Sequence, residues 1–212
     1  HDALPIWLLY DDGAIMDVSF TGLDPVTDTT PAAVLTVTGT NAPNTINYQT
    51  GSTSDRGLVS VDGHETIEFE NKTELVLEGL AGDDTINLDN GNTPTGLELI
   101  TVVGADPTDG DRLTVTGHTE GDVTVDLLLD QITGAEPVPI NFSGIQLVHV
   151  VEGTSSGLQI AFSNNYIFEP GAALDEGTFF TDSVPVSFEG YGDGDDVDLI
   201  GFEAGTLTVR GT

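Results

Sequence analysis

Apolar and polar residues alternate along most of the chain, and glycine closes many of the alternating stretches. The shared pattern is two apolar residues one apart, a spacer and then glycine. Alternation with a period of two predicts half-buried strands, and glycine permits the sharp bends that would separate them. The copies are Val18, Phe20, Gly22; Leu35, Val37, Gly39; Val59, Val61, Gly63; Leu75, Leu77, Gly79; Ile100, Val102, Gly104; Leu113, Val115, Gly117; Ile140, Phe142, Gly144; Val186, Phe188, Gly190; and Leu207, Val209, Gly211.

The copies return at a nearly constant interval. Gly22, Gly63 and Gly104 follow one another at 41 residues, and Gly39 and Gly79 are 40 residues apart. A fixed period of this length indicates a repeat array whose units bury their apolar faces against their neighbours. We therefore expect an all-β chain folded as a parallel β-helix or solenoid of irregular rungs, with a double-rung period of about 41 residues.

Two features qualify this expectation. Short loops between alternating strands also close antiparallel hairpins, so one or two β-sandwich domains are the alternative fold. Residues 164–180 break the rhythm and predict an irregular insertion. Otherwise we expect residues 1–212 to form a single β-repeat domain, as a segment of a longer or self-assembling array.

Acidic or amide side chains recur in the predicted bends. Five residues after the glycine, Asn44, Asp84 and Asp195 each precede a new alternating pair, and Asp111 occupies the same place with two residues inserted. The glycine and strand positions recur even where the acid is replaced by Asn. The repeating architecture therefore explains the bend first, and any role in ion binding is a separate prediction about the acids.

The segment GLAGDDTIN, which begins at Gly79, resembles the haemolysin-type calcium-binding nonapeptide G-G-x-G-x-D-x-U-x. Gly79, Gly82, Asp84 and Ile86 match its first, fourth, sixth and eighth positions, and Leu80 stands at the second glycine. In that family, turn carbonyls and Asp carboxylates of successive turns share calcium. The resemblance implies that Asp84 and the carbonyls near Gly79 and Gly82 bind calcium.

Calcium prefers several oxygen ligands, which other acidic clusters also offer. Asp and Gly are common turn residues as well, so composition alone also accounts for such clusters. Calcium is the expected cofactor under the first interpretation. Its candidate ligands are Gly79, Gly82, Asp83, Asp84, Asp106, Asp109, Asp111, Asp193, Asp195, Asp196 and Asp198.

Composition excludes several partners. Four basic residues oppose 36 carboxylates, which gives a net charge of −32 and repels nucleic acid and anionic lipid. Such acidity indicates bound cations or a surface adapted to high salt. The chain has no cysteine, and its apolar stretch LPIWLLY is too short to span a bilayer.

No reaction centre emerges from the sequence. His64, His118 and His149 belong to no zinc-protease motif, and the chain lacks a phosphate-binding glycine loop. We therefore expect no enzyme, but an extracellular or cell-surface structural or adhesive module of a surface layer, filament or stalk. The alternating stretch at 207–211 resembles the opening of a further rung, so we expect head-to-tail self-association.

The alternative function is a carbohydrate-binding or carbohydrate-active β-helix protein. Glycans would lie in a groove along one face, next to aromatic side chains and carboxylates of successive rungs. The Trp and Tyr residues available for such a groove are Trp7, Tyr10, Tyr48, Tyr166 and Tyr191.

Overall fold

The computed structural model describes residues 26–64, 66–106, 110–162, 166–191 and 195–201, together with strand backbones at 5–9, 15–19 and 207–209. Every regular element in these ranges is a β-strand. Nowhere in the described residues is there a helix long and apolar enough to cross a membrane.

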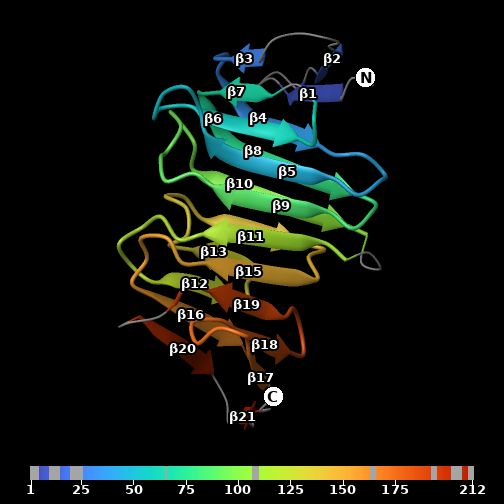
Figure 1. Ribbon diagram of the computed structural model, residues 1–212. Coiled ribbons are helices and arrows are strands. Elements are labelled where there is room, and N and C mark those ends of the chain that lie inside the picture. Colours follow the sequence, from blue (N-terminus) through green and yellow to red (C-terminus); the bar gives the residue numbers. More distant parts are fainter. Residues whose placement is uncertain are drawn as a thin grey trace.

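The strands form two sheets that run the length of the molecule (Figure 1). The first sheet has the order β2-β1-β4-β8-β10-β14-β13-β12-β16-β20. Its strands are β1 (Pro5–Leu9), β2 (Ile15–Ser19), β4 (Ala32–Thr38), β8 (Lys72–Leu80), β10 (Leu99–Ala105), β12 (Val123–Asp126), β13 (Gln131–Thr133), β14 (Ile140–Ser143), β16 (Gly157–Phe162) and β20 (Asp196–Gly201). The second sheet has the order β21-β17-β18-β19-β15-β11-β9-β5-β6-β7-β3. Its strands are β3 (Val26–Asp28), β5 (Thr45–Thr50), β6 (Gly57–Val61), β7 (Ile67–Phe69), β9 (Thr85–Asp89), β11 (Arg112–Thr116), β15 (Leu147–Val151), β17 (Tyr166–Pro170), β18 (Gly177–Thr181), β19 (Val186–Glu189) and β21 (Leu207–Val209).

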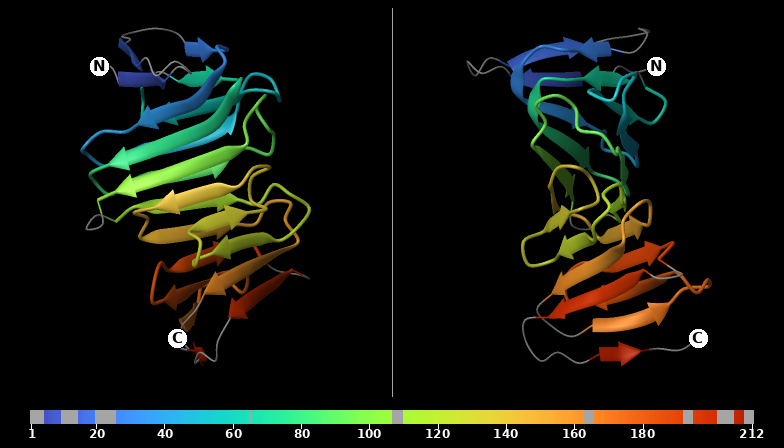
Figure 2. Two further views of the ribbon diagram at one scale, coloured as in Figure 1. Left: turned by 180° about the vertical axis from the view of Figure 1, so that it is seen from behind. Right: turned by 90° about the vertical axis from the view of Figure 1, so that its left-hand side faces the viewer.

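The chain passes from one sheet to the other and back, which makes the fold a β-solenoid of about four turns. Parallel partners on successive turns lie about 38 residues apart. The interval expected from sequence appears directly in the register, since Leu35 pairs with Leu75 and Ile100 with Ile140. Figure 2 shows the turns stacked along one long axis, with the two termini at opposite ends. The solenoid prediction is confirmed.

The second half of the repeat differs from the expected parallel rung. After β5 the chain stays in the second sheet and returns antiparallel through β6 and β7. Strands β12, β13 and β14 make the same kind of return in the first sheet, and β17, β18 and β19 make it in the second. The connecting loops are too short for a parallel crossover, so only antiparallel pairing is open to these strands. The region near 164–180, expected to be an irregular insertion, holds β17 and most of β18.

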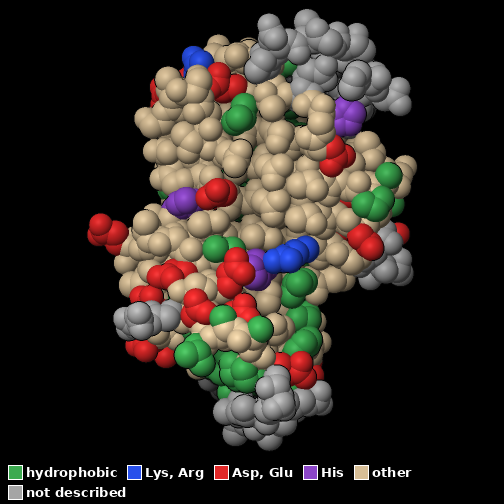
Figure 3. All heavy atoms as spheres, viewed as in Figure 1, with side chains coloured by type: hydrophobic (Ala, Val, Ile, Leu, Met, Phe, Trp, Pro, Cys, Tyr) green, Lys and Arg blue, Asp and Glu red, His purple; other side chains and the backbone are tan. Residues whose placement is uncertain are grey.

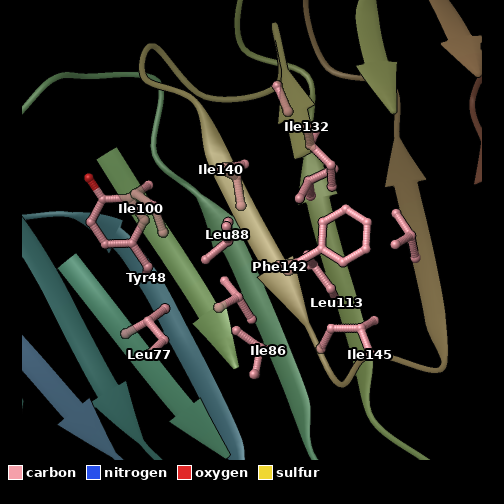
Figure 4. Packing of buried hydrophobic residues seen from close by; sticks show 14 of the residues in the cluster. Tyr48, Leu77, Ile86, Leu88, Ile100, Leu113, Ile132, Ile140, Phe142 and Ile145 are labelled. Carbon is pink, nitrogen blue, oxygen red and sulfur yellow. The ribbon is translucent and has the colours of Figure 1, made fainter. Parts of the chain in front are cut away.

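Apolar side chains from the two sheets meet in one continuous core. The alternating pairs whose side chains the structure describes point inward, and Leu35, Leu75, Ile100 and Ile140 are all fully buried. Figure 4 shows the labelled aliphatic side chains packed between strands of the two sheets. Tyr48 lies at one side of this group, with its hydroxyl directed away from the aliphatic side chains. Buried rows that continue from turn to turn therefore hold the stack together.

Two glycines give a matched test of the bends. A Cβ at Gly104 would collide with the carbonyl oxygen of Gly144 on the next turn and with Asp111, whereas a Cβ at Gly63 would meet no atom within 4 Å. We expect Gly104→Ala to lower the free energy of unfolding by about 1–3 kcal/mol, because backbone must move. Gly63→Ala should change it by less than about 0.5 kcal/mol. Urea unfolding checks both variants, and equal losses would contradict the close packing of turns at Gly104.

Candidate functional site: buried polar groups at the two edges of the solenoid

Two edges join the sheets. We call the bends that follow β4, β8, β10 and β14 the bend edge, and the loops that follow β9, β11, β15 and β19 the loop edge. Both edges carry buried polar side chains. Because a buried polar group is costly without a partner, the contacts of these side chains show what each can do.

A ladder of side chain to backbone hydrogen bonds runs along the bend edge. The N–H of Asn44 donates to Oδ1 of Asp84 at 2.7 Å, and the N–H of Asp84 donates to Oδ1 of Asp111 at 2.9 Å. The N–H of Asp111 in turn donates to Oε1 of Gln146 at 2.7 Å. Asn44, Asp84 and Asp111 are all buried. Each turn thus supplies the acceptor for an N–H of the preceding turn.

The glycine before each bend makes room for this ladder. A Cβ at Gly39 would lie 2.7 Å from Oδ1 of Asn44, and a Cβ at Gly79 would collide with the carboxylate of Asp84. This explains the glycine-to-Asx spacing of the sequence: the side chain folds back over the glycine of its own bend. Asn serves as well as Asp, because both present an oxygen acceptor to an N–H.

The nonapeptide-like segment has a related explanation. Leu80, at the second glycine position of the motif, has a φ of +78°, and Gly82 has a φ of +114°. The Gly82 backbone lies against Ala42 and Pro43 of the preceding bend, where a Cβ would be 2.6 Å from the Pro43 nitrogen. Both residues therefore have a positive φ, and the contact between bends accounts for Gly82.

The predicted calcium ligands fall into two separate groups. Asp83, Asp84, Asp106 and Asp111 all belong to bends of the bend edge, where Oδ1 of Asp83 accepts the N–H of Gly110 at 2.8 Å. Asp195 lies at the loop edge near the far end of the stack, and Asp196 and Asp198 are exposed on β20. Asp109 and Asp193 lie outside the described residues.

Within the described ranges, no three His, Asp or Glu side chains are grouped so as to hold a metal ion. The described contacts of Asp84 and Asp111 give these acids a structural role as acceptors for backbone N–H groups. Calcium binding by the predicted ligands stays a prediction.

A carboxyl group missed by the sequence reasoning lies at the loop edge. Glu136, in the loop between β13 and β14, is 2% exposed, and its Oε1 accepts the N–H of Asn90 at 3.0 Å. Its Oε2 is buried without a hydrogen-bond partner. Burial raises the pKa of Glu136 to about 8, with a contribution from the negative charge of Asp89. The group is therefore neutral at pH 7. Burial and Glu136 also raise the pKa of Tyr48.

The three histidines that the structure describes lie apart from one another. Nε2 of His118 lies 2.7 Å from Oδ1 of Asp89 at the loop edge, whereas His64 sits in the turn after β6. His149 lies on the outer side of β15, where its Nδ1 is 2.8 Å from Oγ of Ser187. Burial and the charge of Arg112 lower the pKa of His149.

Another acidic contact at the loop edge involves Asp195, one of the predicted calcium ligands. A hydrogen bond between Glu152 and Asp195, together with burial and charge repulsion, raises the pKa of Glu152. Glu152 was not a sequence candidate, and its place in the loop after β15, opposite Asp195, becomes apparent only from the stacking of turns.

Comparison of the chain with protein-family models, with curated proteins and with solved structures gave no match. The fold therefore rests on the register and the packing, and the nonapeptide resemblance has no support from a family or a homologue.

Asp111 tests the ladder and the calcium prediction together. We expect Asp111→Ala to cost about 1–3 kcal/mol of unfolding free energy, because the N–H of Asp84 loses its acceptor. Asp111→Asn keeps that acceptor and should cost less. Chemical unfolding of both variants, with and without calcium at constant ionic strength, is the measurement. A large calcium-dependent stabilisation that is present in the wild type and lost in Asp111→Asn would show metal binding instead of a purely structural ladder.

Glu136 predicts a specific pH dependence. Its pKa is raised on folding from 4.5 to about 8. Ionisation therefore favours the unfolded state, and stability falls as the pH rises through this window, by up to about 1.4 kcal/mol per pH unit. Glu136→Gln keeps an acceptor for Asn90 and cannot ionise, so its stability relative to the wild type should increase from pH 5 to pH 9. Thermal unfolding across this range checks the difference, and parallel pH profiles would contradict a neutral buried carboxyl.

Proposed function

We propose that the chain is a structural or adhesive module of the extracellular or cell-surface type, such as a surface layer, filament or stalk. The observation that carries the proposal is the constant register of the parallel strands β4, β8, β10 and β14 in the first sheet and β5, β9, β11, β15 and β19 in the second. Inward rows and the bend-edge ladder pass from turn to turn, so each turn presents its successor with the same binding geometry. Repeat stacks of this kind build stiff, elongated bodies from nearest-neighbour contacts.

The outer strands of the sheets support a further step, which is end-to-end association. Strand β3 is the last described strand of the second sheet and pairs with β7 on one side only. The N–H of Val26 donates to Thr66, and the carbonyl of Asp28 accepts from Glu70, so both residues bond towards β7. Thr27, between them, directs its backbone groups to the opposite side, as alternation along a parallel strand requires. An open strand edge is a template for pairing with another chain.

Charge sets the conditions under which copies can meet. At a net charge of −32, two copies repel each other strongly at low ionic strength. Salt limits the range of such repulsion to about 10 Å at 0.1 M and to about 3 Å at 1 M. Assembly should therefore be favoured by high salt, which also fits a saline or extracellular setting.

We expect the protein to form elongated assemblies whose mass rises with protein concentration and with salt. Thr27→Pro should reduce this association, because proline removes an N–H that points away from β7 without removing a bond to β7. Light scattering and electron microscopy at low and high salt provide the measurement.

Thr27→Val is the matched control, since it retains the N–H and favours a strand. It should assemble like the wild type. A protein that stays monomeric at all salt and protein concentrations would overturn the proposal. Equal assembly of Thr27→Pro and the wild type would exclude β3 as the contact.

The carbohydrate-active alternative is our second choice. It needs aromatic side chains along an accessible groove, but Tyr48 and Tyr191 are buried in the core or at its margin. Tyr166 packs against Phe162 and Phe179 inside an aromatic group at the far end of the stack. The side chains of Trp7 and Tyr10 lie outside the described part of the chain.

A further inference from the structure

Arg112 differs from the other basic side chains that the structure describes. Of the basic side chains that the structure describes, Arg56 pairs with Glu68 at 3.3 Å and Glu70 at 3.5 Å, and buried Lys72 pairs with Asp28 at 3.2 Å. Arg112 has no such partner among the described residues, although the chain carries 36 carboxylates. Among the described basic side chains, Arg112 is therefore the one without a carboxylate in ion-pair range.

The placement of Arg112 leaves one direction for an anion to approach. Arg112 begins β11, and the register sets it between Thr85 of β9 and Leu147 of β15 on the outer side of the second sheet. Its Nε is buried without a hydrogen-bond partner, whereas the residue as a whole is partly exposed. Part of the residue is therefore open to solvent. The planar fork of the guanidinium matches a carboxylate in a bidentate arrangement.

The neighbouring charged groups are engaged elsewhere. His149 is 8% exposed and contacts Ser187, and its Nε2 lies 3.7 Å from Oε1 of Glu189. Glu189 is thus engaged with His149. Figure 3 shows basic and histidine side chains side by side near the middle of this face.

The surface around Arg112 is polar, and the acids at its margin are engaged with backbone: Asp62 accepts the N–H of Thr45 at 2.7 Å and Asp83 accepts the N–H of Gly110 at 2.8 Å. Thr45, Asn47, Thr85, Asn87 and Thr114 occupy the outward positions of β5, β9 and β11 nearest to it. Asn47 and Asn87 already form a regular row, in which Nδ2 of Asn87 donates to Oδ1 of Asn47 at 2.9 Å. In Figure 3 this part of the face consists mainly of uncharged polar side chains and backbone, and acidic groups gather closer to the C-terminal end. Hydroxyl and amide groups in rows suit the hydroxyls of a sugar.

We propose that this face binds a sugar acid, with its carboxylate on the guanidinium of Arg112 and its hydroxyls on the adjacent Thr and Asn side chains. A single carboxylate meets a local positive charge, whereas a polyanion is repelled by the remaining surface. The site is independent of the strand edges that would join copies end to end. It adds ligand binding to the proposed structural role and involves no reaction.

Methyl glucuronide and methyl glucoside are matched probes, because they differ in the carboxylate. NMR titration of the wild type at moderate salt should give saturable shifts for residues of β9 and β11 with the glucuronide and no such shifts with the glucoside. Arg112→Gln should weaken binding of the glucuronide by about tenfold or more, as expected for loss of a charge-assisted pair. Arg112→Lys should also weaken it, since the fork is lost.

Arg56→Gln is the control, because Arg56 already has two carboxylate partners, and it should bind the glucuronide like the wild type. Equal binding by Arg112→Gln and the wild type would overturn the proposal. Acetate binding as tightly as the glucuronide would refute recognition of the sugar. A third outcome would also reject the sugar site: the wild type gives no shifts with the glucuronide, and Arg112→Gln lowers the mass of the assemblies. Arg112 would then bind a carboxylate of a second copy of the chain.

Discussion

The stack depends on how each bend satisfies the backbone N–H groups that the sheets do not reach. A buried N–H without an acceptor would cost more than a typical hydrogen bond contributes. Asp84 and Asp111 provide the acceptors from one turn further along, so each bend is complete only when the following turn is in place. The glycine at the start of the bend is part of the same device, because a side chain at Gly79 or Gly104 would occupy the space of the acid. Stacking and bending are therefore one constraint.

The parts of this arrangement that repeat could be predicted from the sequence. Alternation identifies inward residues such as Leu35 and Leu75. The number of residues between these two equals the length of one turn, because they pair on neighbouring strands. The bend position was visible too, because Asn44 takes the place of an acid without disturbing the spacing. The structure explains that substitution, because an amide oxygen and a carboxylate oxygen both accept hydrogen bonds.

The remaining features depend on contacts that carry no local signal. Val59 and Val61 follow the same alternating pattern as Leu75 and Leu77, yet β6 runs antiparallel and β8 parallel to the neighbours it meets. Alternation specifies which face is buried and leaves the direction of the strand open. Glu136 is a similar case: it meets Asn90, 46 residues earlier, only because the return through β13 places its loop at that edge. The partly buried position of Arg112 likewise arises from neighbours on two other turns.

Acidity has different consequences inside and outside this fold. Specific contacts or a raised pKa offset the cost of burying these acids. Asp84 and Asp111 accept N–H groups, Asp28 pairs with Lys72, and the raised pKa of Glu136 favours its neutral form. None of these solutions requires salt, because each partner belongs to the chain or comes from water. The exposed acids have few cations beside them, since the chain has only four basic residues and Lys72 is buried. Their mutual repulsion is a long-range effect that ions in solution must screen. The fold and its response to salt therefore have separate physical origins, and a change in surface charge can alter association between copies while leaving the buried ladder intact.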